Sequence, residues 1–167
     1  MAEVTQLAQA EQAVASVADP ELPMLSLADL GVVRAVELEG GRVVVTLTPT
    51  YTGCPAFTTI KADVRLALAR EGFTEVEVRT ALSPAWSTEW LSDAGRRALQ
   101  QHGIAPPAHL KGSSTVDLVL LPRAAAPECP RCGATATREV SRFGASACTA
   151  FHVCTACGEP FDRMREL

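Results

Sequence analysis

Four cysteines near the C-terminus have the spacing of a metal site. They form two C-x2-C pairs, Cys129–Cys132 and Cys154–Cys157, with 21 residues between the pairs. A tight turn brings the two thiolates of a pair to one side, and a hairpin between the pairs would complete a tetrahedral set. Gly133 and Gly158 each follow a pair, where a backbone with positive φ is favoured. The spacing predicts a structural zinc site, with an iron–sulfur cluster on the same thiolates as the alternative.

Metal binding would also supply the folding energy of the tail. Residues 128–167 hold few large apolar side chains, so a hydrophobic core alone could hardly fold them. The N-terminal residues lack the basic and apolar regions of a secretion signal, so we expect a cytoplasmic protein. In that compartment, clustered cysteines indicate metal ligation before disulfides.

Two further cysteines lie outside the pairs. Cys54 ends the loop Thr50-Tyr51-Thr52-Gly53, and Pro55 after it favours a helix whose N-cap is Cys54. At a helix N-terminus the dipole would lower the pKa of the thiol and favour the reactive thiolate, although a lone cysteine is often inert. Cys148 is either a small buried hydrophobe or a second functional thiol beside the metal. We expect His152 to be a bystander, because four thiolates leave no vacant ligand position.

Carboxylates gather in two turns of the N-terminal half. Asp19-Pro20-Glu21-Leu22-Pro23 forms a rigid acidic loop, and Asp29 begins a turn that ends at Gly31. Asp19, Glu21 and Asp29 could serve as loop caps or as functional groups. Trp86 and Trp90 are expected to anchor an irregular segment to the core.

Hydrophobic periodicity and turn residues predict the elements that position these side chains. Gly40-Gly41 lies between two β-rich runs and predicts a hairpin turn. Ser92 is a good helix N-cap, and Gly103 is expected to end that helix. The expected helices span residues 2–17, about 55–71 and 92–102, and the expected strands span 32–39, 42–48, 74–82 and 116–121.

This order of elements predicts an α+β fold, a small sheet with helices packed on one face, followed by a four-cysteine zinc-ribbon-like tail. The expected domains are a body at residues 1–104, a linker at 105–127 that includes the strand 116–121, and the ribbon-like domain at 128–167.

Charge and motif content exclude several function classes. The net charge is −4, residues 1–123 hold ten basic and fourteen acidic side chains, and residues 124–167 hold five of each. Without a basic surplus, nucleic-acid binding is disfavoured. The longest apolar runs are far shorter than a membrane span, which needs about 20 residues. No phosphate-binding loop, H-E-x-x-H or paired E-x-x-H motif is present, so we do not expect a catalyst of turnover.

Several motifs in matching order resemble a known family. Asp19-Pro20-Glu21, Asp29-Leu30-Gly31 and Gly53-Cys54-Pro55 resemble the SufT-like metal–sulfur cluster biosynthesis domain family. The segments 82–90 (LSPAWSTEW) and 143–148 (FGASAC), with the tail cysteines, are similar to a narrower group, the PaaD (PaaJ) family associated with the phenylacetyl-CoA ring epoxidase.

The resemblance implies an accessory or maturation role in aerobic phenylacetate breakdown, where the epoxidase uses a di-iron centre and an iron–sulfur reductase subunit. It places the family's functional cysteine on Cys54, its acidic loop on Asp19, Glu21 and Asp29, and a fifth tail cysteine on Cys148. The leading hypothesis is therefore a metallocentre assembly factor that holds iron or an iron–sulfur cluster transiently and partners the oxygenase and reductase subunits. The alternative is a structural subunit that docks on the oxygenase through its zinc tail. A homodimer through a sheet edge stays open.

Overall fold

The chain folds into two compact units, residues 1–95 (unit 1) and 96–167 (unit 2). The computed structural model describes residues 2–108 and 126–166, so the strand expected at 116–121 lies outside the described residues. The sequence places the boundary after residue 104, whereas in the structure it falls inside helix α4 (Asp93–Gln101). It does so because strand β4 (Ile104–Ala105) pairs in parallel with β7 (Pro160–Met164) of the tail.

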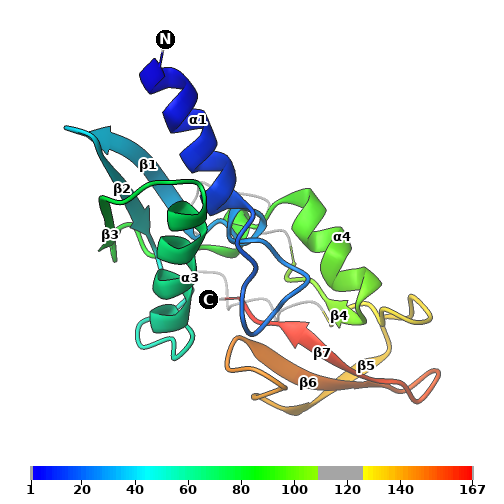
Figure 1. Cartoon of the computed structure of the whole chain (residues 1–167). Helices are drawn as coiled ribbons and strands as arrows, with labels where there is room; N and C mark the ends of the chain where they lie inside the picture. The colour runs from blue at the N-terminus through cyan, green and yellow to red at the C-terminus, as the bar shows by residue number, and fades with distance from the viewer. Residues whose placement is uncertain (1, 109–125, 167) are drawn as a thin grey trace, which may run out of the picture. The chain divides into compact units, whose positions relative to one another are not determined.

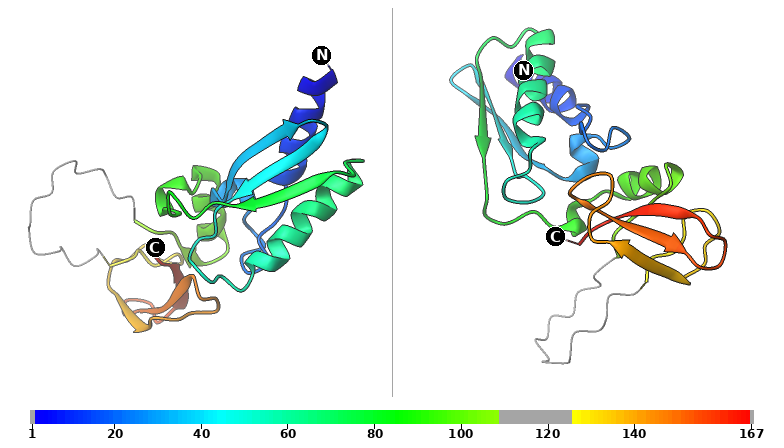
Figure 2. Two further views of the ribbon diagram at one scale, coloured as in Figure 1. Left: turned by 90° about the vertical axis from the view of Figure 1, so that its left-hand side faces the viewer. Right: turned by 90° about the horizontal axis from the view of Figure 1, so that it is seen from below.

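Unit 1 is a three-stranded sheet in the order β1-β2-β3 with helices on one face, which confirms the predicted fold class (Figures 1 and 2). Strands β1 and β2 form an antiparallel hairpin, and β3 runs parallel to β2 after the crossover helix α3. Its elements are α1 (Ala2–Ala15), α2 (Leu27–Leu30), β1 (Val33–Glu39), β2 (Arg42–Leu47), α3 (Phe57–Arg70), β3 (Val76–Thr80) and the short 3-10 helix η1 (Thr88–Trp90).

The hairpin turn and the helix-facing side of the sheet follow the predicted pattern. Gly40 and Gly41 have φ of 56° and 87°, the left-handed geometry that a two-residue hairpin turn requires. Apolar residues of β2 and of α3 are fully or almost fully buried and form the core between sheet and helix: Val43, Val45, Leu47, Ile60, Val64 and Leu68. In Figure 2, α1 and α3 cover the same face of the sheet.

The opposite face of this sheet carries charges. Arg79 of β3 donates to Glu39 of β1 at 2.9 Å and to Glu77 at 2.8 Å, and Arg42 of β2 donates to Glu77 at 3.0 Å. These side chains are partly exposed, so water screens each pair and its contribution to stability is small. The sheet is therefore apolar toward its helices and carries charged pairs on its other side, where the fully buried Val44 lies between Glu37 and Glu77.

Two tryptophans attach the irregular segment before α4 to the core of unit 1, as the sequence predicts. Trp86 is 4% exposed, and its indole N–H donates to the Leu30 carbonyl at 2.9 Å. Trp90 is half-buried, with the Arg34 guanidinium carbon 3.7 Å from its ring centroid. Ser92 is the N-cap of α4, since its hydroxyl accepts the Gly95 N–H at 2.9 Å.

Unit 2 contains a four-stranded sheet in the order β4-β7-β6-β5, where β5 is Thr137–Ser141 and β6 is Thr149–Cys154. Its small core joins Ala105 and Phe161 to two of the cysteines, Cys129 and Cys154. No helix in the described part of the chain combines the length and the apolarity that a bilayer crossing requires.

Candidate functional site

The four tail cysteines converge in unit 2 and form the four-cysteine cluster, Cys129, Cys132, Cys154 and Cys157. The first pair lies in the turn before β5, and the second begins at the last residue of β6 and continues into the turn before β7, so the predicted hairpin does join them. Gly133 and Gly158 have φ of 73° and 80°, and their N–H groups donate to the carbonyls of Cys129 and Cys154. The glycine positions are thus confirmed as left-handed turn positions.

The sulfur geometry of the cluster suits a tetrahedral metal. The Sγ atoms of Cys129 and Cys157 are 3.8 Å apart, those of Cys132 and Cys154 are 3.6 Å apart, and all four lie within 4.8 Å of one another. A tetrahedral site with metal–sulfur bonds of about 2.3 Å has sulfur–sulfur separations of about 3.8 Å. The cluster is therefore arranged for a structural ion such as zinc.

Backbone dipoles and an ion pair support this cluster. The N–H groups of Cys157 and Ala156 point at the sulfur of Cys154 and lower its pKa to about 7, which favours the thiolate that a metal binds. Arg131, inside the first pair, forms an ion pair with Glu159, which follows the second pair. One cysteine of each pair is buried and the other is exposed, so the cluster lies at the edge of the small core.

Cys148 lies apart from the cluster, in the connection between β5 and β6. Its side chain is 6% exposed, and its sulfur is 3.0 Å from the hydroxyl of Ser146. Among the described residues it does not join the group of close cysteine sulfurs. His152 is also buried, stacks on Phe161 with ring centroids 5.6 Å apart, and lies outside the cluster as expected.

The position of Cys54 differs from the sequence prediction. Helix α3 begins at Phe57 with Ala56 as its N-cap, so Cys54 is not the N-cap residue. Pro55 and Ala56 extend the turn instead, because the φ that proline fixes suits a turn as well as a first helical position. The Cys54 N–H donates to the Tyr51 carbonyl at 3.3 Å, and the Cys54 carbonyl accepts the Phe57 N–H at 3.2 Å. These two bonds hold the half-buried cysteine in a tight loop.

The predicted lowering of the Cys54 pKa is also wrong. Burial raises the pKa of the thiol above its usual value because it removes water from the thiolate, and the carboxylates of Glu21 and Asp19 raise it further. The Ala56 N–H and the Tyr51 hydroxyl oppose this rise by hydrogen bonding to the sulfur. Tyr51 was not identified from the sequence as a site residue. Its position in the loop, three residues before Cys54, could have indicated this contact.

The three acidic residues have different surroundings. Asp19 is 6% exposed and accepts the N–H groups of Glu21 and Leu22 at 2.9 and 2.8 Å, so it shapes the acidic loop as well as acting on Cys54. Asp29 instead accepts the hydroxyls of Ser92 and Ser26. In the described part of the chain, only the four-cysteine cluster brings three or more ligand side chains within metal-binding distance. Among its described residues, unit 1 thus has one thiol near carboxylates and not a complete set of metal ligands.

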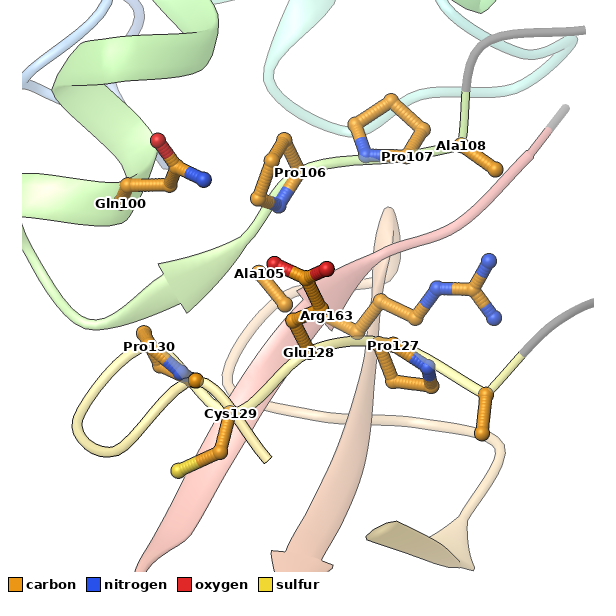
Figure 3. A pocket seen from close by; sticks show the side chains of 12 residues that line it. Gln100, Ala105, Pro106, Pro107, Ala108, Pro127, Glu128, Cys129, Pro130 and Arg163 are labelled. Carbon is orange, nitrogen blue, oxygen red and sulfur yellow. The ribbon is translucent and has the colours of Figure 1, made fainter. Parts of the chain in front are cut away.

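Two cavities lie close to these residues. One of about 50 Å³ borders the Cys54 loop and is lined by Tyr51, Trp86 and Thr48, whose buried hydroxyl has no hydrogen-bond partner among the described residues. The other, of about 570 Å³, lies within unit 2 beside Cys129. Figure 3 shows prolines from two segments on its opposite sides, Pro106 and Pro107 facing Pro127 and Pro130.

Two family models match the chain in sequence. A model described as an iron–sulfur cluster assembly protein matches residues 7–80, and one described as the PaaD zinc beta ribbon domain matches residues 114–165. The first match lies within unit 1 and the second within unit 2.

Known proteins resemble the chain at two levels. A protein of Escherichia coli (strain K12), named as a candidate component of 1,2-phenylacetyl-CoA epoxidase, is 40% identical over 152 residues, 91% of this chain and 88% of that protein. An Fe-S protein maturation auxiliary factor of Porphyromonas gingivalis is 34% identical over 80 residues, 47% of this chain and 75% of that protein. The crystal structure of a DUF59 domain of unknown function from Bacillus anthracis matches with a TM-score of 0.55 and 30% identity, covering 59% of this chain and 95% of that one.

Proposed function

The chain belongs to the PaaD family of 1,2-phenylacetyl-CoA epoxidase components, and on this basis we propose that it is a maturation factor for that epoxidase. It assists the assembly of an iron or iron–sulfur centre on the oxygenase or the reductase in the course of aerobic phenylacetate degradation, and it does not itself turn over substrate. Support comes from the iron–sulfur assembly model that matches unit 1 and from the relative named as an Fe-S protein maturation auxiliary factor.

The setting of Cys54 is the observation that carries the proposal. Burial and the charges of Glu21 and Asp19 raise the pKa of this thiol, which favours its protonated form. The same negative charges attract a cation, so iron competes with the proton: a sulfur–iron bond forms as the proton leaves to solvent. The negative charges around Cys54 therefore favour a cationic cargo. This cargo is either ferrous iron or an iron–sulfur cluster with an iron atom that can bind the Cys54 sulfur.

The number of protein ligands at each site determines how long a bound metal stays there. Cys54 offers a single thiolate, and a cargo held by one protein ligand dissociates easily, as transfer to a partner requires. The four-cysteine cluster offers four thiolates, which suit a permanent structural ion. When bound there, zinc would cross-link the two cysteine pairs and stabilise unit 2. Cys148 is the second candidate thiol for transient iron, buried beside Ser146.

The test is anaerobic purification of the chain co-expressed with the epoxidase subunits, followed by metal analysis and by assay of the epoxidase. The wild type is expected to carry stoichiometric zinc and labile iron. Cys54→Ser should lose the iron, keep the zinc and leave the epoxidase short of iron. Thr52→Ala, an exposed change in the same loop, is the matched control, and Cys148→Ser shows whether the second thiol shares the role. A stoichiometric complex and full epoxidase activity with Cys54→Ser would favour the structural-subunit alternative instead.

A further inference from the structure

The connection between β5 and β6, whose ribbon is drawn in Figure 1, contains the aromatic residue Phe143. Phe143 is 67% exposed, the largest exposed fraction among the large apolar side chains of unit 2 that the structure describes. Val140 of the same hairpin is 48% exposed, at the position where the register between β5 and β6 shifts. Neither side chain belongs to the four-cysteine cluster or to the Cys54 loop, so their exposure requires another explanation.

The backbone around Phe143 is held firmly. The Phe143 N–H donates to the Ser141 hydroxyl at 3.1 Å, and the Gly144 N–H donates to the Thr149 carbonyl at 2.9 Å. A side chain at Gly144 would drive its Cβ into Asp162 Oδ1, and the Ala145 N–H donates to the other oxygen of Asp162 at 3.3 Å. A ring presented by a fixed loop loses little conformational entropy on binding, which is the advantage of a preorganised interface.

Arginines neighbour Phe143 in space and in sequence. The Arg165 guanidinium carbon lies 5.7 Å from the ring centroid of Phe143, and Arg142 is the exposed residue just before it. Arg142, Arg163 and Arg165 line a cavity of about 200 Å³ together with Glu139, Ala150 and Glu166. Arg163 forms an ion pair with Glu166, which leaves Arg142 and Arg165 as the cations available to an incoming carboxylate. Aromatic and arginine side chains together are the usual composition of binding hot spots.

The charge of the chain differs between its two units. Unit 1 carries six basic and thirteen acidic side chains, a formal charge of −7, whereas unit 2 carries nine basic and six acidic, a charge of +3 that falls to +1 when four thiolates hold a divalent zinc ion. Unit 2 is the more positive of the two units in either state, and its hairpin arginines are matched to an acidic partner surface. A nucleic acid is disfavoured because unit 1 would repel it and because the arginine-lined cavity also contains two glutamates.

We propose that Phe143, Arg142 and Arg165, here named the hairpin surface, dock on an acidic protein surface of the epoxidase that holds an apolar hollow for the ring. The proposal rests on the proposed function in taking the epoxidase as the partner. The ring enters the hollow, and carboxylates at its rim pair with the two arginines. The acidic partner and the basic unit 2 would attract each other over about 8–10 Å at ordinary salt, so binding weakens as salt rises.

The experiment measures binding of the purified full-length chain to the purified epoxidase by calorimetry at several salt concentrations. Phe143→Ser and Arg142→Glu are expected to weaken binding by about tenfold or more each. Val4→Ser, which removes an exposed apolar side chain of α1, and Arg97→Glu, which reverses an exposed charge of α4, should stay within about twofold. Zinc content and Cys54-dependent iron loading are measured on the same samples, and both should be unchanged in the hairpin variants.

Each result decides the proposal. Tight binding that the two hairpin variants leave unaltered would overturn it, as would a wild type that does not bind the epoxidase. Binding of a DNA or RNA duplex that depends on the same residues would assign the surface to nucleic acid, and a dimer that the variants dissociate would assign it to a second copy of the chain. If docking depends on Phe143 while iron loading is absent, the docking proposal stands and the maturation function fails.

Discussion

The hydroxyl of Ser92 donates to the carboxylate of Asp29 across 2.6 Å, joining the turn at α2 to the N-cap of α4. Asp29 also exchanges hydrogen bonds with Ser26: its carboxylate accepts the Ser26 hydroxyl at 2.7 Å, and its N–H donates to that hydroxyl at 3.0 Å. Ser26 is thus the N-cap of α2, and the Asp29 carboxylate fixes the orientation of the capping hydroxyl. Asp29 therefore stabilises the frame of unit 1, a role different from that of Asp19 and Glu21 beside Cys54.

The first prediction concerns this frame. Asp29→Ala should destabilise unit 1 by about 1–2 kcal/mol, because two hydroxyl donors lose a charged acceptor. Both tryptophans of the chain lie in unit 1, so the urea midpoint of tryptophan fluorescence measures this unit alone. Glu11→Ala, an exposed change on α1, is the control and should move the midpoint little. An equal effect of both variants would contradict the structural role of Asp29.

The pH dependence of the same variant has a defined sign. The hydroxyls of Ser92 and Ser26 lower the pKa of Asp29 below its ordinary value of 3.8. A carboxyl whose pKa is lowered in the folded state contributes stability above its unfolded pKa, and that contribution is lost as the pH falls through the folded pKa. The stability difference between wild type and Asp29→Ala should therefore be constant near neutral pH and shrink below about pH 4.

The second prediction concerns the reactivity of Cys54. Because burial and the nearby carboxylates raise the pKa of its thiol, the zinc-loaded protein should alkylate at Cys54 more slowly at neutral pH than a model thiol does. Glu21→Gln should lower that pKa and increase the rate at pH 8 by about twofold. The measurement is alkylation against pH, followed by peptide mass spectrometry, with Asp63→Asn as a charge control on α3. A wild-type rate above that of the model thiol would contradict the observed environment.

The third prediction concerns the dependence of unit 2 on metal. Replacing Cys129 or Cys154 by Ser should unfold residues 126–166, since these two sulfurs are also half of the small apolar core. Structural zinc contributes on the order of 10 kcal/mol in small metal-folded peptides, more than this core could replace. Cys148→Ser should retain zinc, and tryptophan fluorescence of unit 1 should be unchanged in all three. Amide resonances of unit 2 that stay dispersed without metal would argue against this dependence.

The fourth prediction separates backbone strain from a steric contact. Gly31 has φ of 73°, and a Cβ there would lie 2.5 Å from the carbonyl oxygen of Trp90. Gly40 also has positive φ, but a Cβ there meets nothing within 4 Å. Gly40→Ala should cost about 1–2 kcal/mol from backbone strain alone, and Gly31→Ala about 1–3 kcal/mol more, because Trp90 must shift. Equal urea midpoints for the two variants would show that the contact has no cost.

Local chemistry explains what could be predicted from the sequence. A C-x2-C-G pair defines its own turn, so the four-cysteine cluster and the left-handed Gly133 and Gly158 were predictable from spacing. The hairpin at Gly40-Gly41 and the N-cap at Ser92 depend on neighbouring residues in the same way. These features need no knowledge of the rest of the fold.

Tertiary contacts explain what could not. The pKa of Cys54 depends on burial and on Asp19 and Glu21, which precede it by more than 30 residues in the sequence. The short strand β4 could not be predicted, because two residues are too few to show periodicity and the strand is defined by its pairing with β7. Cys54 follows a strand and precedes a proline, a local sequence that is compatible with a helix N-cap and with a turn. Only the packed structure shows that it adopts the turn.

The sulfur pairs at 3.6 and 3.8 Å connect different cysteine pairs, Cys132 with Cys154 and Cys129 with Cys157. An ion bound by all four sulfurs therefore ties the first turn to the second and closes a ring of the chain that contains β5 and β6. Losing that ion opens the ring at both ends of the hairpin at once, which is why loss of a single ligand is expected to unfold residues 126–166 instead of fraying one turn.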